Sequence, residues 1–133
     1  MEPNKVVVRY LDGRVLKGHT NDFLPTKDSF HLTRLDEPAA KPVEVHLREL
    51  KAIFFVRDFT GNPQHIDRKE FDPSQPLMGR KIQVLFKDGE LLVGTTQGYQ
   101  PGRTGFFVTP ADPESNHYRC FVISGATREV SFI

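Results

Sequence analysis

The chain lacks most of the features that mark secreted, membrane and disulfide-rich proteins. Its single cysteine, Cys120, excludes a disulfide framework within the chain and favours a reducing compartment. The first residues, MEPNK, contain no apolar signal-peptide core, and no apolar run reaches the length of a membrane span. We therefore expect a cytoplasmic protein that does not bind a membrane.

A surplus of positive charge, which nucleic-acid binding normally needs, is also absent. The chain has 18 Lys and Arg residues against 17 Asp and Glu residues. Phosphate backbones are bound by basic faces, so the overall balance argues against a nucleic-acid partner. A local basic patch remains open, and its candidate members are Arg9, Arg14, Lys17, Lys27, Arg103 and Arg119.

No segment has the periodicity of a long helix, and tryptophan is absent. Apolar and polar residues instead alternate in short stretches, as in residues 5–11, where Val6, Val8 and Tyr10 share one face. Eleven phenylalanines accompany this alternation. The pattern predicts short strands around compact, aromatic β cores.

An internal repeat organises the chain. Residues 5–33 and 81–109 align without a gap at a shift of 76 positions, and ten of the 29 aligned residues are identical. Each copy has an Asp-Gly pair, at 12–13 or 88–89, for which we expect a type I′ hairpin turn. Each copy also has a glycine in its second strand, Gly18 or Gly94, which predicts a bulge or sharp bend.

The repeat predicts five strands per copy, with a short 3₁₀ turn allowed near residues 48–51. The expected strands are 5–11, 14–24, 29–34, 43–49 and 50–56 in the first copy, and 81–87, 90–99, 105–109, 119–124 and 127–133 in the second. We therefore predict an all-β fold: two tandem five-stranded small barrels, at 1–56 and 81–133, packed together and joined by a polar linker at 57–80. One ring of each pair Phe54-Phe55 and Phe106-Phe107 should lie between the two barrels.

The segments VVVRYLDGRVLKG and IQVLFKDGELLVG resemble the first motif of Sm-like proteins, which have SH3-like barrels. The resemblance covers each copy almost end to end and implies that fold. Sm-like proteins contact RNA bases through an aspartate and an asparagine after the aromatic residue of the second strand. Here Leu24 follows Phe23 and Gln100 follows Tyr99, so the resemblance does not imply RNA binding. The whole chain also resembles an uncharacterised bacterial family of tandem architecture, through the segment GFFVTPADPESNHYRCFV at 105–122.

The polar loop at 110–119 is the strongest candidate for a binding site. Loops on rigid scaffolds often carry function, and this one is dense in groups that bind ligands. The candidate ligand-binding residues are Asp112, Glu114, Ser115, Asn116, His117 and Arg119. The structural alternative is that Asp-Pro and Ser-Asn only build two consecutive turns.

The sequence contains no Gly-rich phosphate loop, no Ser/His/Asp arrangement and no catalytic pair of carboxylates. None of the five histidines has ligand spacing with a cysteine; His19, His31 and His46 could converge across a barrel, although ordinary strand histidines are the preferred interpretation. We interpret Cys120 as a small buried residue and not as a nucleophile. We thus expect no catalytic residue, no metal site and no cofactor.

These features favour a non-catalytic binding or assembly module. Its partner would be a protein, a peptide or a small ligand, or a second copy joined through barrel edges. The alternatives are a module that binds RNA or a cyclic dinucleotide through the basic residues named above, and a small enzyme that uses the 110–119 loop.

Overall fold

The computed structural model describes residues 3–60, 69–71, 73–74 and 79–133, and within them the protein is built from strands without an α-helix. Two 3₁₀ turns, Leu47–Glu49 and Ser124–Ala126, precede the last strand of each half, and the first overlaps the turn expected near residues 48–51. The strands are β1 (Asn4–Tyr10), β2 (Val15–Thr20), β3 (Ser29–Arg34), β4 (Val43–His46), β5 (Leu50–Val56), β6 (Arg80–Phe86), β7 (Leu91–Thr96), β8 (Gly105–Pro110), β9 (His117–Ile123) and β10 (Thr127–Phe132). The predicted all-β class is confirmed.

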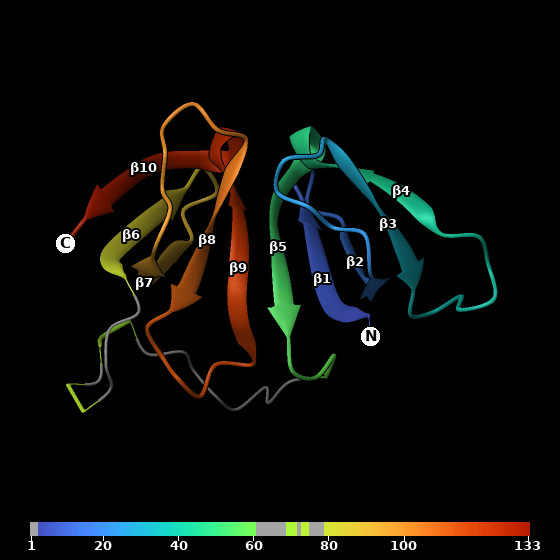
Figure 1. Cartoon of the computed structure of the whole chain (residues 1–133), viewed down its shortest axis with the longest axis horizontal. Coiled ribbons are helices and arrows are strands. Elements are labelled where there is room, and N and C mark those ends of the chain that lie inside the picture. Colours follow the sequence, from blue (N-terminus) through green and yellow to red (C-terminus); the bar gives the residue numbers. More distant parts are fainter. Residues whose placement is uncertain (1–2, 61–68, 72, 75–78) are drawn as a thin grey trace.

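All described strands belong to one antiparallel sheet of ten strands, in the order β10-β6-β7-β8-β9-β5-β1-β2-β3-β4. Figure 1 shows two lobes, the first half (β1–β5) and the second half (β6–β10), with β5 and β9 side by side where the lobes meet. In that pair Ala52 lies opposite Val122 and Phe54 opposite Cys120. The two halves are therefore joined by backbone hydrogen bonds as well as by side-chain packing.

The hairpin turns at the two Asp-Gly pairs differ from the expected type. The Gly13 N–H donates to the Tyr10 carbonyl at 3.1 Å, and the Tyr10 N–H donates to the Arg14 carbonyl at 2.9 Å. In this turn only Gly13 has a positive φ, of 95°. The connection is a three-residue loop, a type I turn closed by a left-handed glycine. The prediction of a type I′ turn is wrong, because that turn would need a positive φ at Asp12 too.

The glycine in the second strand of each half allows that strand to approach the third. A Cβ added at Gly18 would collide with the carbonyl oxygen of Thr33, and one added at Gly94 would collide with that of Thr109. Glycine is therefore required at both positions by the close contact of two backbones. The contact lies where β2 pairs with β3, and β7 with β8.

The sheet surrounds two hydrophobic cores, and its middle strands contribute to both. Phe55 lies in the first core and Phe54 in the second. Phe106 lies in the second core, whereas Phe107 packs against the first. Phe121 of β9 also enters the first core, although it belongs to the second half. The prediction that the paired phenylalanines serve both a core and the contact between the halves is confirmed.

The polar segment predicted as a linker joins β5 to β6, and most of it lies outside the described residues. Its expected limits, 57 and 80, fall at the end of β5 and the start of β6. Phe71, one of its described residues, lies under the Lys81 ammonium, 5.0 Å from the ring centroid. In the described part of the chain, no helix is long and apolar enough to span a membrane.

Candidate functional site

The predicted loop at 110–119 is shorter in the structure, because β8 ends at Pro110 and β9 begins at His117. Most of the remaining loop, at 111–116, forms contacts within the chain. Asp112 and Ser115 are buried, at 2% and 1% exposure. The Asp112 carboxylate accepts a hydrogen bond from the Glu114 N–H at 2.9 Å, and its carbonyl accepts one from the Ser115 N–H at 3.1 Å. Glu114 itself is exposed. These contacts match the structural alternative of consecutive turns, with an aspartate that caps the backbone two residues on.

Asn116 attaches this loop to the residues that follow β5. Its side-chain amide donates to the Asp58 carbonyl at 2.8 Å and accepts from the Asp58 N–H at 3.1 Å. The Arg57 N–H donates to the Asn116 carbonyl at 2.9 Å. The side-chain amide of Asn116 therefore makes the two hydrogen bonds that a paired backbone residue would make with Asp58. It extends the β5–β9 pairing beyond the end of β5. His117 pairs with Val56 and packs edge-on against Phe54, with ring centroids 5.1 Å apart.

Arg119 differs from the rest of the predicted set because its guanidinium contacts aromatic rings and, among the described residues, forms no ion pair. Its guanidinium lies over two rings, 4.2 Å from the centroid of Phe55 and 4.7 Å from that of Phe107. Its Nε is buried and has no hydrogen-bond partner in the described part of the chain. No carboxylate among the described residues forms an ion pair with it. Buried polar atoms are rarely left unbonded, so this Nε is an exception among the described residues.

The aromatic side chains around this guanidinium are Phe55, which is fully buried, and three half-buried rings, Phe23, Phe107 and Tyr118. Phe23, from the loop after β2, packs against Phe55, Phe107 and Phe121 with ring centroids 5.6, 6.2 and 5.1 Å apart. Tyr118 lies beside Phe55 at 6.5 Å. We call Phe23, Phe55, Phe107, Tyr118 and Arg119 the Arg119 cluster. It joins a loop of the first half to β8 and β9 of the second, so both halves are needed to build it.

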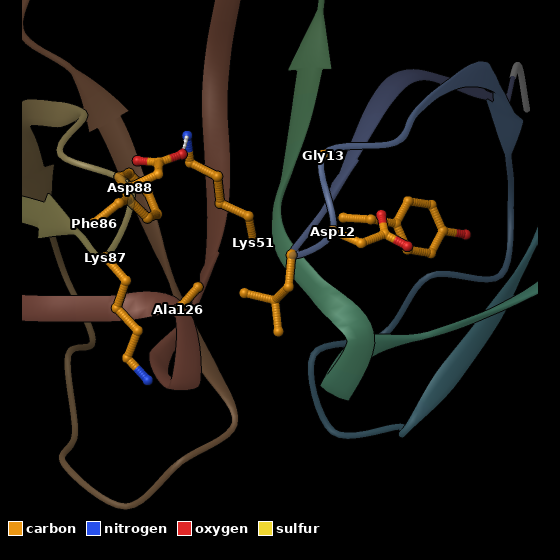
Figure 2. A pocket seen from close by; sticks show the side chains of 9 residues that line it. Asp12, Gly13, Lys51, Phe86, Lys87, Asp88 and Ala126 are labelled. Atoms are coloured by element: carbon orange, nitrogen blue, oxygen red, sulfur yellow. Dashed lines mark ion pairs between the residues drawn. The ribbon is translucent and has the colours of Figure 1, made fainter.

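A second polar group, formed by Lys51, Asp88 and Glu90, lies beside the two Asp-Gly turns. Lys51, on β5, bonds to the Asp88 carboxylate at 2.7 Å and to the Glu90 carboxylate at 2.5 Å, and its side chain is 11% exposed. Figure 2 shows it reaching across to Asp88, beside Phe86, in a cavity of about 280 Å³ lined by both Asp-Gly turns. Burial lowers the pKa of Lys51, but the two carboxylates outweigh it and hold that pKa above its usual value. The ammonium is thus neutralised within the chain and ties the halves together.

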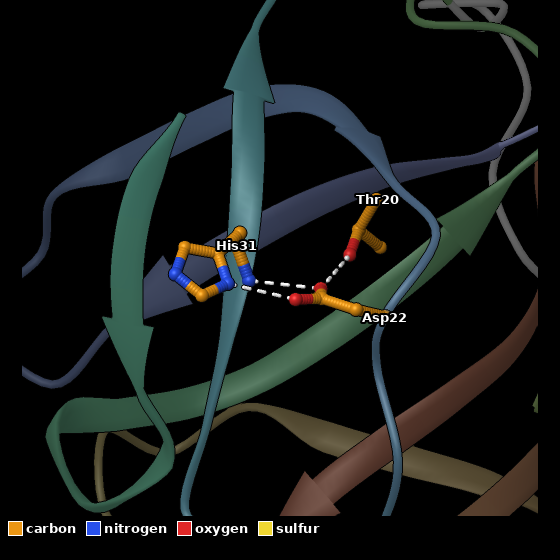
Figure 3. Close-up of polar contacts among 3 residues, drawn as sticks. All are labelled: Thr20, Asp22 and His31. Atoms are coloured by element: carbon orange, nitrogen blue, oxygen red, sulfur yellow. Dashed lines mark hydrogen bonds and ion pairs between the residues drawn. The ribbon is translucent and has the colours of Figure 1, made fainter. Parts of the chain in front are cut away.

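Thr20, Asp22 and His31 form a third polar group (Figure 3). The Asp22 carboxylate accepts from the Thr20 hydroxyl at 3.1 Å, from the His31 N–H at 2.9 Å and lies 2.7 Å from His31 Nδ1. Burial raises the pKa of Asp22, but the hydrogen bonds from His31 and Thr20 outweigh this effect and hold that pKa below its usual value. Both side chains bond the same carboxylate, so the imidazole cannot activate the hydroxyl as a nucleophile requires. The group fastens the loop that carries Phe23.

The remaining histidines and the cysteine have local packing roles. His19 packs edge-on against Phe59, and His46 lies 3.0 Å from the Glu44 carboxylate, while His65 lies outside the described residues. Among the residues that the structure describes, no three His, Cys, Asp or Glu side chains are grouped as metal ligands. Cys120 is fully buried in the second core, and this burial raises the pKa of its thiol far above the usual value.

The geometry defines an all-β protein in which two repeated halves share one sheet and one aromatic–arginine cluster. The chain belongs to a family of unknown function, DUF6982, whose model matches residues 2–133. No curated protein and no solved structure matches the chain significantly. The expected membership of an uncharacterised family agrees with this result.

Sequence reasoning identified Arg119, and it placed one ring of each pair Phe54-Phe55 and Phe106-Phe107 between the halves, but it did not connect these rings, Phe23 or Tyr118 with Arg119. Phe23, Phe55 and Phe107 come from three different strands or loops, and only the pairing of β5 with β9 brings them together. The available signals were the pairs Phe54-Phe55 and Phe106-Phe107, each of which places a ring on each face of a strand.

Proposed function

We propose that this protein is a non-catalytic binding module made of two small barrels of the Sm/SH3-like kind. Support for the barrels comes from the strand pairing, because β6–β10 repeat the pairing of β1–β5 and each half has its own core. Glycine inside a strand often marks a tight bend at a barrel corner or a close backbone approach, and Gly18 and Gly94 each stand at such an approach.

We place the binding surface at the Arg119 cluster, and its partner is a protein segment that presents a carboxylate beside an apolar side chain. The observation that carries this proposal is the Arg119 guanidinium, stacked on Phe55 and Phe107 with a buried Nε that has no described partner. Arginine with tyrosine and phenylalanine is a composition typical of the energetic centre of protein interfaces. A guanidinium also pairs well with a carboxylate, through two parallel hydrogen bonds.

Three of the other candidate basic side chains favour a protein partner over a nucleic acid, whereas Lys27 and Arg103 are exposed. Arg14 bonds to Asp12 at 2.9 Å, Lys17 donates to the Phe59 carbonyl at 3.1 Å, and Arg9 lies over Phe54 at 5.6 Å. Each is thus engaged with its own neighbours, and the net charge is only +1. A nucleic-acid backbone would need several free cations on one face.

The test is a selection of random peptides displayed on phage against the immobilised protein, followed by affinity measurements on the selected peptides. We expect enrichment of Asp or Glu next to an aromatic or aliphatic residue. The Arg119→Gln variant should bind these peptides at least tenfold more weakly, and Arg119→Lys should not recover full affinity, because an ammonium lacks the planar double contact. Arg9→Gln is the matched control, since it also removes an arginine stacked on a phenylalanine.

Two outcomes would overturn the proposal. One is a selection without any consensus. The other is a set of peptides that bind Arg119→Gln as tightly as the unmodified protein while its thermal transition is unchanged. A parallel titration with single-stranded RNA and cyclic dinucleotides tests the alternative of nucleotide binding. Salt-sensitive binding that depends on Arg119 would show that the partner is a nucleotide and not a protein.

A further inference from the structure

The junction between the halves pairs two strands with different roles. β5 is the last strand of the first half, and β9 is the fourth strand of the second half. Along β5, Phe54 points into the second core and Phe55 into the first. Along β9, Phe121 and Ile123 enter the first core and Val122 the second. Each strand of the junction therefore fills part of the core of the opposite half.

The strands that correspond to β5 and β9 in the other half lie at the two ends of the sheet. β10 pairs with β6 as β5 pairs with β1, and β4 pairs with β3 as β9 pairs with β8. β10 and β4 are the outermost strands. The junction joins two different surfaces, those of β5 and β9, and each has an unpaired equivalent at an end of the sheet, β10 and β4. The same kind of pairing could therefore form between β10 of one copy and β4 of the next.

On β10, the residues at the positions that would enter a neighbouring core are polar. Leu85 lies opposite Glu129 and Gln83 opposite Ser131, as Arg9 lies opposite Ala52 and Val7 opposite Phe54. The pairing thus gives two exact correspondences, which are Ala52 with Glu129 and Phe54 with Ser131. A carboxylate in place of a methyl group, and a hydroxyl in place of a ring, would each be desolvated in that core.

On β4, too, polar residues stand at the positions where β9 has apolar ones. His31 lies opposite Glu44 as Phe107 lies opposite Phe121, and Ser29 lies opposite His46 as Gly105 lies opposite Ile123. Glu44 and His46 therefore stand where β9 has Phe121 and Ile123, and they bond to each other at 3.0 Å. β4 also has four residues where β9 has seven.

Pro42 lies at the position that corresponds to Arg119, two residues before the position of Phe121. A proline there removes a backbone donor that a neighbouring strand would need.

The exposed ring of β10, Phe132, is covered by an arginine of the same chain. In the first half, Arg119 of the second half lies over Phe55. In the second half the corresponding ring, Phe132, is 41% exposed beside a hollow of about 400 Å³. Arg80, from the adjoining strand, lies 3.8 Å over this ring. An arginine of the same half thus covers Phe132, whereas Phe55 is covered by an arginine of the other half.

We propose that the β5–β9 junction is a head-to-tail pairing surface that the chain uses once, and that Glu44, His46, Glu129 and Ser131 prevent its use by a second copy at the outer edges. The assembly therefore stops at two halves, and the outer edges reject another copy of this chain. Short edge strands with charged residues and proline are the usual means of preventing such growth.

The test restores the apolar residues and measures mass by light scattering. One variant changes the β4 edge (Glu44→Phe with His46→Ile), a second changes the β10 edge (Glu129→Ala with Ser131→Phe), and a third combines all four changes. The unmodified protein should keep the mass of one chain at all concentrations. The combined variant should form rings or filaments of several chains.

The two single-edge variants are the controls that separate specific pairing from general stickiness. Each alone should keep the mass of one chain, because its restored edge has no restored partner. Mixed together they should form a complex of two chains and no larger species. The proposal is wrong if the unmodified protein assembles through these edges, if the folded combined variant keeps the mass of one chain, or if a single-edge variant associates alone as strongly as the mixture.

Discussion

Phe121 belongs to the second half of the chain, yet its ring lies in the first core, so its replacement by alanine should destabilise both halves together. The ring is 1% exposed, with its centroid 5.1 Å from that of Phe23 and 4.9 Å from that of Phe107. Phe23 comes from the first half and Phe107 from the second. Removal of the ring leaves a cavity at the place where the two halves meet.

The expected loss follows from the size of the ring and its burial. Phe-to-Ala changes in well-packed cores cost about 3–5 kcal/mol of unfolding free energy. The entropy of unfolding is about 0.28 kcal/mol/K for 133 residues, from roughly 2.1 cal/mol/K per residue. The melting temperature of Phe121→Ala should therefore fall by about 11–18 °C. Phe132→Ala, in the equivalent position to Phe55 but 41% exposed, is the matched control and should cost about 1–2 kcal/mol.

Calorimetry combined with native-state hydrogen exchange measures the effect in each half. We expect one melting transition, and equal losses of protection at the amides of β1 and β6, because β5 and β9 contribute side chains to both cores. Two separate transitions would refute this reasoning. So would amides in β1 that keep their protection while those of β6 lose it, since the halves would then unfold independently.

Three further changes test other contacts. Lys51→Met should cost about 1 kcal/mol or less, because its acidic partners are more than half exposed, and should return the lowered pKa of Asp88 towards its usual value in a carboxyl NMR titration; an unmoved pKa would contradict the ion pair. Asp22 has a lowered pKa in the folded state, so the stability that it provides is present above its usual pKa, near 4, and is lost as the pH falls through the lowered value. The melting temperatures of the unmodified protein and Asp22→Asn should therefore converge as the pH falls below about 4, and a constant difference would contradict this. Gly94→Ala should lower the melting temperature by several degrees, because the added methyl group meets the Thr109 carbonyl, whereas Gly98→Ala, in open space, is the control.

Alternation of apolar residues was enough to locate the strands, and β3 and β5 have the predicted limits of 29–34 and 50–56. β2 ends at Thr20 and not at residue 24, because Asp22 and Phe23 leave the strand to bond His31 and to cover the first core. The turn type was missed since hairpin register, and not the Asp-Gly pair alone, sets the loop length.

The joining of the halves through β5 and β9 could not be predicted from periodicity, because a strand's pattern does not name its neighbour. One indication was present: the segment LKAIFFV at 50–56 is apolar on both faces, as is typical of a strand buried on both sides. The candidate site, too, could be predicted only in part. Composition singled out Arg119, but its aromatic neighbours come from distant parts of the chain, and only the sheet brings them together.

The use of β9 to complete the first core has a consequence for how the chain matures during synthesis. When the ribosome has produced β1–β5, the first core still lacks Phe121 and Ile123, and the backbone edge of β5 has no partner. Most of the second half must be translated before that edge is protected. We expect nascent chains stalled before residue 117 to remain protease-sensitive and to bind chaperones, and a rare-codon pause placed there should lower the soluble yield. The shared strand pair thus makes folding of the early half wait for the late one.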